Sequence, residues 1–443
     1  MTAPALEDFA GDAAAVARRA AFRDDIKPDA STDLVAVSGQ IWNRPSLRHI
    51  HDYARARRTS PWAVLGVAMA RAVVATPPFV MLPPLVGSEA SLNLFVALVG
   101  PSGSGKGAAE AAAADAIEVG SIYTAHAGSG EGIPHLFAHR EKARVTRDRD
   151  AVLLTVPEVD SLTALGSRQG STLLPVLRSA WSGERLGFAN ADHNRTLPIE
   201  RHSYRLGLIL GVQPARAAAL LNDSDGGTPQ RFLWLPTVDK HAPDVRPTAP
   251  APRKLATHVW PGDMRGRHIL PVPDVAKTAV DRATLARARG EGDPLEGHAL
   301  LCRLKAAQGL ALLDDRPAIT DEDWQHAGLL MAVSDHTRST VQRELAAAAT
   351  AANLAKGRAE GLRGAVAADT LHDHAIQRVC QWVTRHLAKQ PDETARGDVR
   401  KAMPSRDRQY FDEAIERLRA AGQINEITTP HGTRLATTEK SRP

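Results

Sequence analysis

Residues 92–117, LNLFVALVGPSGSGKGAAEAAAADAI, constrain the fold of this chain more than any other segment. An apolar run of strand length ends at Gly100, a loop with three more glycines and one lysine follows, and an Ala-rich helical stretch comes next. Glycine loses more conformational freedom on folding than any other residue, so a loop this rich in glycine indicates a backbone that must approach a ligand closely. Backbone N–H groups in such a loop, together with a helix N-terminus, are suited to a phosphate group.

The spacing of the loop matches a known nucleotide-binding pattern. Gly100, Gly105 and Lys106 fit G-x-x-x-x-G-K, the Walker A pattern, with a strand before it and a helix after it. We therefore expect ATP as a ligand, with Lys106 reaching the β- and γ-phosphate oxygens, and Mg²⁺ beside it. Gly107 departs from the pattern, which has Ser or Thr there to hold the magnesium ion; Ser104 or a water molecule could replace that contact. The predicted nucleotide-binding residues are Gly100, Pro101, Ser102, Gly103, Ser104, Gly105, Lys106 and Gly107.

A second nucleotide-binding element is predicted in AVLLTVPEVDSL, an apolar run that ends in acidic residues and resembles a Walker B strand. The usual order is an Asp that holds magnesium followed by a Glu that activates water. Pro157 occupies the Asp position, Glu158 the catalytic position, and Asp160 follows. We predict Glu158 as the general base and Glu158 with Asp160 as the metal ligands. The alternative is a buried strand with polar residues at its end.

Composition limits the classes of protein that remain. With 443 residues, 43% of them hydrophobic, the chain has room for two or three globular domains. A net charge of +5 permits a nucleic-acid partner without requiring one, and two cysteines are too few for a disulfide framework or a zinc cluster. The first residues lack a secretory signal, and the longest apolar region, 62–86, is interrupted by an arginine and four prolines. We therefore expect a soluble cytoplasmic protein.

The pattern of apolar residues changes several times along the chain and divides it into regions. Between residues 89 and 240, strand-length apolar runs (LNLFVALVG, AVLLTVPEV, RLGLILGVQ and RFLWLP) alternate with helical stretches, which predicts an α/β unit with a mostly parallel sheet. The residues on either side read as helical, and the segment 355–369, AKGRAEGLRGAVAAD, reads as a flexible link. The predicted regions are an N-terminal helical region (1–88), the α/β core (89–240), a Pro-rich connector (241–273), a helical region (274–360) and a C-terminal unit (370–443).

A β-hairpin is predicted just before the fourth strand, where GFANADHNRTLPIERHSY has a turn-forming cluster between two short extended arms. At its tip lie His193, Asn194 and Arg195, whose side chains could donate hydrogen bonds to DNA phosphates. The alternative is a solvated turn, because Asp192 dilutes the positive charge. Gln213 ends the next strand, and the sequence GGTPQRFLW follows.

These elements in this order resemble the AAA+ helicase module of the minichromosome-maintenance type. They are more similar still to the primase-helicase or Rep proteins of phages, plasmids and integrated islands in high-GC bacteria. The resemblance covers about residues 60–340. It implies an α/β AAA+ P-loop core, with a parallel sheet and helices on both faces, plus an N-terminal helical collar and a helical lid.

The resemblance also implies site residues. Arg231, in the sequence QRF, would be the arginine finger that reaches the ATP of a neighbouring subunit, Arg303 the second sensor, and Gln213 the polar sensor. The alternatives are an ordinary arginine at a strand start for Arg231, an ion pair on a helix face for Arg303, and a group that satisfies the strand end for Gln213.

The C-terminal unit reads as three helices followed by a β-hairpin with a Pro-His-Gly turn, which predicts a winged helix. Arg406 and Arg408 would begin the third helix, the one expected in the major groove, and His431 and Arg434 would lie on the wing. The alternative is a winged helix that binds protein, because the acids Asp407, Asp412 and Glu413 are interspersed.

The sequence therefore predicts an ATP-dependent, ring-forming DNA helicase, hexameric by resemblance, with single-stranded DNA in its channel and duplex DNA at the winged helix. The alternative is a replication initiator or regulator that binds DNA under the control of ATP and does not unwind it. A small-molecule P-loop kinase is disfavoured by the winged helix and by the arginine finger.

Overall fold

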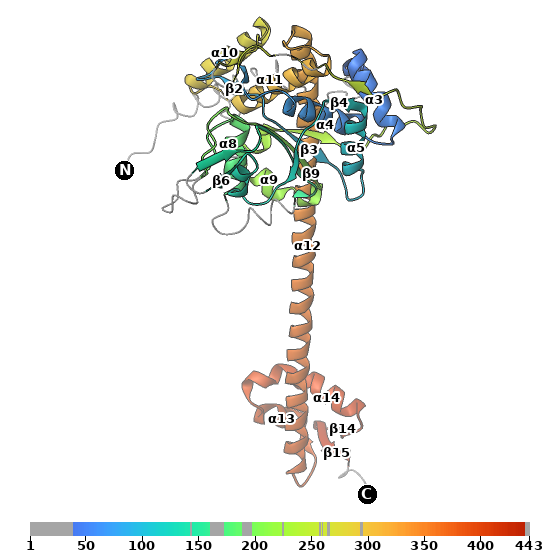
Figure 1. Cartoon of the computed structure of the whole chain (residues 1–443). Helices are drawn as coiled ribbons and strands as arrows, with labels where there is room; N and C mark the ends of the chain where they lie inside the picture. The colour runs from blue at the N-terminus through green and yellow to red at the C-terminus, as the bar shows by residue number, and fades with distance from the viewer. Residues whose placement is uncertain are drawn as a thin grey trace, which may run out of the picture. The chain divides into compact units, whose positions relative to one another are not determined.

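The computed structural model describes residues 39–438, apart from 142–143, 160–171, 188–196, 224–225, 257, 259, 264–265 and 293–295. Two compact units are distinguished, Met1–Ala347 and Ala348–Pro443. Figure 1 shows the chain coloured from its N-terminus to its C-terminus. Among the described residues, no helix combines the length and the apolar character needed to cross a membrane.

The first unit is built on a five-stranded sheet in the order β10-β3-β9-β8-β5, and all of its strands are parallel. Nearly every residue of β3, β8, β9 and β10 is buried, which explains why these strands read as continuous apolar runs rather than alternating ones. The predicted parallel α/β sheet is thus confirmed. The strands are β3 (Leu94–Val99), β5 (Thr124–His126), β8 (Ala151–Val156), β9 (Arg205–Val212) and β10 (Phe232–Pro236).

The strand order brings distant parts of the sequence together. After β3 the chain runs to β5 at one edge of the sheet, returns through β8 and β9, and then crosses β3 to form β10 at the other edge. The carboxyl ends of β3, β8, β9 and β10 therefore lie on one side of the sheet, with β9 between β3 and β8. In open α/β sheets this side, where the strand order reverses, is where ligands bind.

One helix, α4 (Pro61–Val74), supports much of this sheet. It begins at Pro61 after Ser60, and packs against β3, β8, β9 and β10 as well as against α3 (Pro45–Ala56) and α5 (Lys106–Ala116) (Figure 1). Gly66 allows this close packing, because a Cβ there would lie 2.8 Å from a methyl carbon of Val96. The helix is accordingly buried along most of its length.

Shorter elements and three further long helices complete the first unit. Residues 241–273, predicted as a connector, contain two short strands that pair with strands from earlier in the chain. The remaining elements are β1 (Val80–Leu82), β2 (Ala90–Ser91), β4 (Ile117–Glu118), α6 (Gly132–His135), β6 (Ala138–Glu141), β7 (Arg144–Arg147), α8 (Leu173–Ser182), η2 (Pro214–Arg216), α9 (Ala218–Asn222), η3 (Pro229–Arg231), β11 (Arg253–Lys254), β12 (His268–Ile269), α10 (Asp274–Ala288), α11 (Glu296–Leu313) and α12 (Asp321–Ala388).

Helix α12 runs through the segment 355–369, which we predicted as a flexible link, so that prediction is wrong. The segment contains Gly357, Gly361 and Gly364, each of which weakens a helix by about 1 kcal/mol relative to alanine. The alanines and long side chains around them are the strongest helix formers, and no proline interrupts the run. Residues 346–374 are exposed on all sides of the helix.

The second unit contains the end of α12, three shorter helical segments and a small sheet in the order β13-β15-β14. Its own core includes Val383, Phe411, Leu418 and Leu435. A hairpin of β14 and β15 follows the helices, as predicted. The elements are β13 (Thr394–Ala395), α13 (Arg396–Ala402), η4 (Ser405–Tyr410), α14 (Phe411–Ala420), β14 (Ile424–Thr429) and β15 (Gly432–Thr437).

Candidate functional site

The Gly-rich loop connects the end of β3 directly to the start of α5. Gly103 and Gly105 have φ angles of +75° and +80°, a left-handed conformation that glycine adopts without the strain of a side chain. Gly105 is the N-cap residue of α5 and Lys106 is its first residue. The loop therefore places the N-terminus of an 11-residue helix at the carboxyl edge of the sheet, which favours an anion there.

Thr237, which sequence reasoning missed, closes the loop from the end of β10. Its hydroxyl oxygen lies 2.7 Å from Ser104 Oγ and its backbone N–H donates a 2.8 Å hydrogen bond to the Val99 carbonyl. A Cβ at position 100 would overlap the Thr237 hydroxyl, so only glycine fits there. The role of Gly100 in this structure is thus close packing against Thr237.

The Lys106 ammonium folds back over the loop. Its Nζ donates hydrogen bonds of 3.1 Å to the Gly100 carbonyl and 2.9 Å to the Pro101 carbonyl. Partial burial lowers the pKa of Lys106, and the negative charge of Glu158 opposes that change. The contacts of Nζ are neutral carbonyl oxygens, so a phosphate oxygen would be a stronger partner for the same cation.

Glu158 and Gln213 meet at the ends of neighbouring strands. Gln213 Nε2 donates a hydrogen bond of 3.2 Å to Glu158 Oε1. Gly211 makes this approach possible, because a Cβ there would overlap the Pro157 carbonyl oxygen and lie 3.2 Å from Lys106 Cδ. The structure therefore brings together three of the predicted site residues, Lys106, Glu158 and Gln213, at the carboxyl edge of the sheet.

The described residues fit a phosphate chain better than they fit a protein-bound magnesium ion. Gly107 has no side chain, the Ser104 hydroxyl is engaged by Thr237, and Asp160 lies outside the described residues. Within the described ranges, no group of three or more His, Cys, Asp or Glu side chains could hold a metal ion. Glu158 is the one predicted metal ligand whose position the structure gives.

Arg231 lies at the opposite, amino edge of the sheet, immediately before β10. Its side chain is 8% exposed; Nη1 donates a 2.7 Å hydrogen bond to the Gly226 carbonyl, and the guanidinium carbon lies 5.5 Å from the centre of the Trp181 ring. Burial lowers the pKa of Arg231 to about 10, and the neighbouring Arg178 adds to that effect. About six strand residues, or roughly 20 Å, separate it from the phosphate loop of its own chain.

Arg303, the predicted second sensor, packs against Trp324 within the first unit. Its guanidinium carbon lies 3.8 Å from the centre of the Trp324 ring, and Nε and Nη2 donate to the Trp324 carbonyl at 3.2 and 2.9 Å. Burial lowers its pKa to about 10. These partners are a backbone carbonyl and an aromatic ring, so they do not show the ion pair that is the alternative for Arg303, and the sensor role stays a prediction.

The predicted hairpin tip, with His193, Asn194 and Arg195, lies outside the described residues. The base of the hairpin is described: Leu186 and Ile199 form an antiparallel bridge with hydrogen bonds of 2.9 and 3.0 Å in both directions. One antiparallel pair of residues therefore precedes β9, and the hairpin itself stays a prediction.

The predicted DNA-binding residues of the second unit differ in whether their side chains are exposed or already donate hydrogen bonds within the unit. Arg406 and Arg408 lie in the 3-10 segment η4 rather than at the start of a helix, because α14 begins at Phe411. Arg408 donates to the Met403 and Lys401 carbonyls at 3.1 and 2.7 Å, whereas the Arg406 side chain is 78% exposed. Arg434 Nη1 donates to the Glu393 carbonyl at 3.3 Å, and His431 is exposed in the turn after β14.

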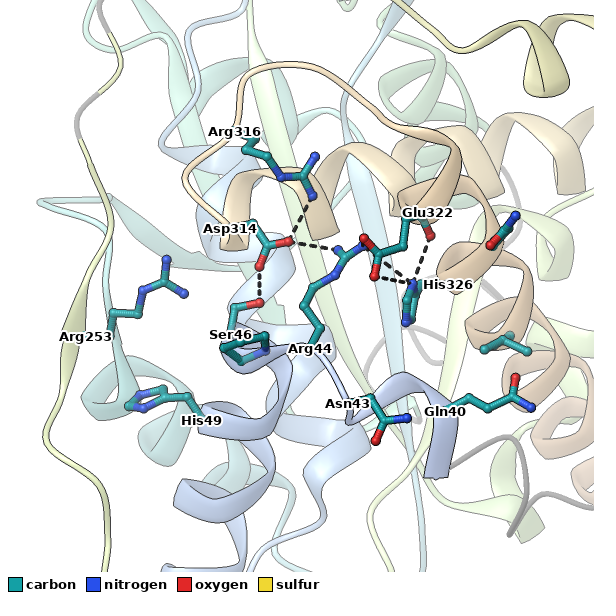
Figure 2. Close-up of a pocket in the computed structure, with 13 residues that line it drawn as sticks. Gln40, Asn43, Arg44, Ser46, His49, Arg253, Asp314, Arg316, Glu322 and His326 are labelled. Carbon is teal, nitrogen blue, oxygen red and sulfur yellow. Dashed lines mark hydrogen bonds and ion pairs between the residues drawn. The ribbon is translucent and has the colours of Figure 1, made fainter.

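A separate polar pocket of about 930 Å³ lies between α3, the turn after α11 and the start of α12. Figure 2 shows Arg44 reaching between Asp314 and Glu322. Arg44 and Arg316 also bind the fully buried Asp323, each at 2.7 Å. These acids and arginines pair with one another, so the pocket offers an anion or a cation little unpaired charge. None of the predicted site residues lines it.

Comparison with protein families finds none that matches this sequence, and comparison with curated proteins finds no match either.

Proposed function

We propose that this chain is an ATP-hydrolysing, ring-forming DNA helicase subunit of the AAA+ type, similar to the Rep-like replication proteins of phages and mobile elements. One observation carries the proposal. The Gly-rich loop with Lys106 and the hydrogen-bonded pair of Glu158 and Gln213 converge at one edge of a parallel sheet, although about 50 residues separate each from the next along the chain.

Each of these residues has a role in the proposal. The loop N–H groups and Lys106 would hold the phosphates of ATP through charge-assisted hydrogen bonds. Glu158 would accept a proton from the attacking water, and Gln213 orients that carboxylate through its amide. Because β9 lies between β3 and β8, Gln213 at its end would lie between the phosphate loop and Glu158 and could contact both a bound phosphate and the Glu158 carboxylate.

The position of Arg231 supports assembly into a ring. At the amino edge of the sheet, it is out of reach of a nucleotide held by its own loop, so a role in hydrolysis requires a second copy. The second unit supports DNA binding more weakly: its helices and hairpin follow the order expected of a winged helix, with Arg406 and His431 exposed.

Two measurements test the proposal. Wild-type protein should bind ATP in calorimetry, whereas the Lys106→Ala variant should not; Lys277→Ala, which removes an exposed lysine of the same unit, is the control. Wild-type protein should also displace a strand from a forked duplex when ATP is present. Equal ATP binding by the wild type and Lys106→Ala would refute the nucleotide site.

A second candidate function, an ATP-controlled DNA-binding initiator that does not unwind DNA, is favoured by the missing magnesium ligands. Pro157 and Gly107 replace the Asp and the Ser or Thr that hold magnesium in the full pattern. Such a protein would bind ATP and duplex DNA and would leave the fork intact in the strand-displacement assay.

A further inference from the structure

Thr237 is held more rigidly than the Gly-rich loop that it touches. It directly follows β10, and its backbone N–H donates a 2.8 Å hydrogen bond to the carbonyl of Val99, the last residue of β3. The carbonyl of the same peptide group, that of Pro236, accepts a 2.7 Å hydrogen bond from the Ser60 hydroxyl at the start of α4. The Thr237 residue is 6% exposed, so packing fixes its side chain as well. A residue held in this way is a fixed point for a loop that is rich in glycine.

The hydroxyl groups of Thr237 and Ser104 join this fixed point to the loop. Their oxygens lie 2.7 Å apart, and the Thr237 oxygen also lies 3.1 Å from the Val99 carbonyl oxygen. A Cβ on Gly100 would overlap the Thr237 hydroxyl and would lie 2.5 Å from Ser104 Oγ, so glycine at this position leaves room for the pair. Ser104 is half-buried, whereas Thr237 is buried. The Ser104 hydroxyl is therefore the member of the pair that a ligand in the loop can reach.

A hydroxyl group carries one proton, so Thr237 donates either to Ser104 or to Val99, and two arrangements of the pair follow. In the first, Thr237 donates to the Val99 carbonyl and the Ser104 hydroxyl donates to Thr237. In the second, Thr237 donates to Ser104, whose own proton is then available to another acceptor. The change costs little, because the Val99 carbonyl keeps the hydrogen bond from the Thr237 N–H. An anion in the loop would select the second arrangement, since hydrogen bonds to charged acceptors are the stronger ones.

Asp239 and Glu158, two acids at this edge of the sheet, already have partners. Asp239, two residues after Thr237, pairs with Arg55 at 2.9 Å. Glu158, which follows β8, accepts a 3.2 Å hydrogen bond from Gln213. A phosphate group without such a partner would accept a hydroxyl proton from the loop more strongly than either carboxylate.

We infer that Thr237 is a positioning residue for nucleotide binding, whose hydroxyl donates to Ser104 Oγ and so directs the Ser104 hydroxyl proton to a phosphate oxygen. The inference rests on the proposed function and extends its nucleotide site to a residue 133 positions after Ser104, outside the Walker A pattern. The loop itself, residues 100–107, carries no acidic side chain that would compete with the phosphate for this proton. Thr237 acts on the nucleotide through Ser104 and does not touch it.

The test measures the affinity of the full chain for ATPγS with Mg²⁺ by calorimetry. Ser104→Ala removes the hydrogen bond to the phosphate and should weaken binding about tenfold. Thr237→Val keeps the branched shape without the hydroxyl and should weaken binding about fivefold, the factor for one neutral hydrogen bond. Thr237→Ser keeps the hydroxyl and should bind within about twofold of the wild type. Thr76→Val is the matched control, because it removes another buried threonine hydroxyl of this unit, one that donates to the Ala72 carbonyl at 3.1 Å.

A double variant separates positioning from packing. Because Thr237 acts through Ser104, adding Thr237→Val to Ser104→Ala should cause no further loss of affinity. Losses that multiply in the double variant would show an independent packing role and overturn the inference. Thr237→Ala is measured beside Thr237→Val in case valine disturbs the fold, and urea midpoints without nucleotide report folding. Wild-type affinity in a folded variant without the Thr237 hydroxyl would overturn the inference and leave the nucleotide site intact. Failure of the wild type to bind ATPγS, or equal binding by Lys106→Ala, would instead remove the proposed function and the inference with it.

Discussion

Gln213 Nε2 donates a hydrogen bond of 3.2 Å to Glu158 Oε1 and so links the carboxyl ends of β9 and β8. The amide holds one oxygen of the carboxylate, and the other oxygen would accept the proton in the proposed hydrolysis. Both side chains are accessible at the edge of the sheet that carries Lys106. This pair is the part of the site that the proposed hydrolysis depends on most directly.

Glu158→Gln should separate nucleotide binding from turnover. The amide keeps the shape of the side chain but cannot accept a proton, so hydrolysis should fall by about 10²–10⁴ while ATP affinity stays near the wild-type value. Gln213→Ala should give a smaller loss, because the carboxylate remains but is no longer oriented. Steady-state phosphate release and calorimetry on the same samples measure the two effects, and normal turnover by Glu158→Gln would place the base elsewhere.

Gly107→Ser should improve magnesium-dependent hydrolysis. A Cβ at position 107 meets no other atom within 4 Å, so the serine fits without displacing a neighbour, and its hydroxyl would lie where the Walker A pattern has its magnesium contact. Gly107→Ala is the control, because it adds the same Cβ and helix propensity without the oxygen. We expect Gly107→Ser alone to lower the Mg²⁺ concentration that gives half-maximal hydrolysis; the same shift in Gly107→Ala would refute the hydroxyl explanation.

Local features of this fold could be predicted from sequence and long-range ones could not. The buried strands and the loop before Lys106 are encoded in contiguous residues, as apolar runs and glycine spacing. The role of Thr237 could not be predicted, because it arises only when β10 pairs with β3, more than 100 residues earlier in the chain. The role of Gly211 arises only when β9 pairs with β8 and meets Pro157. One sequence signal for Thr237 exists: it is a polar residue directly after the strand β10, as Gln213 is directly after β9, and the ends of parallel strands lie at the same edge of a sheet.

Arg303 and the segment 355–369 illustrate a second limit on what can be predicted from the sequence. Motif order predicts a sensor role for Arg303, which stays a prediction; its stacking on Trp324 could not be predicted, because Trp324 lies on another helix and has no sequence signal. The glycines in 355–369 suggest a link, but summed helix propensity outweighs them. In both cases the observed structure depends on residues outside the pattern from which the prediction was made: Trp324 for Arg303, and the helix-forming residues for the glycines of 355–369.

Arg44→Met should destabilise the first unit strongly. Arg44 is 7% exposed and contacts Asp314 and Glu322 (Figure 2). It also binds the fully buried Asp323, so its removal leaves buried carboxylates with fewer partners. The expected loss is about 3–5 kcal/mol of unfolding free energy, as for other broken buried ion pairs. Arg48→Met, at an exposed position of α3, the helix that Arg44 caps, is the control for urea-induced unfolding. A similar midpoint for the two variants would contradict the structural role of the network.

His202 should make the stability of the first unit fall in mild acid. Burial, and then the charge of Arg201, lower the pKa of His202 from 6.5 to about 4. The unfolded chain therefore takes up a proton below pH 6.5 that the folded chain does not take up until about pH 4, so unfolding becomes more favourable as pH falls through this window. Asparagine tolerates the φ of +56° at this position, so His202→Asn should fold and should show a shallower loss of stability between pH 6.5 and 4 in urea titrations. An unchanged slope would show that other groups cause the loss.

Replacing Arg406 and His431 together by alanine should weaken binding to duplex DNA without unfolding the second unit. Both side chains are exposed, and Arg406 has a weak partner, Asp407, whose carboxylate oxygen lies 3.6 Å from its Nε. If each side chain neutralises a phosphate, the slope of log K against log salt should fall by about 0.9 for each phosphate that is no longer neutralised. Arg417→Ala is the control, because its guanidinium already binds Asp373 and Glu413 at 2.7 and 3.0 Å. The exposed face of α14 carries Asp412, Glu413 and Glu416, which would repel a phosphate backbone. An unchanged salt slope in the double variant would therefore favour a protein partner for this unit over DNA.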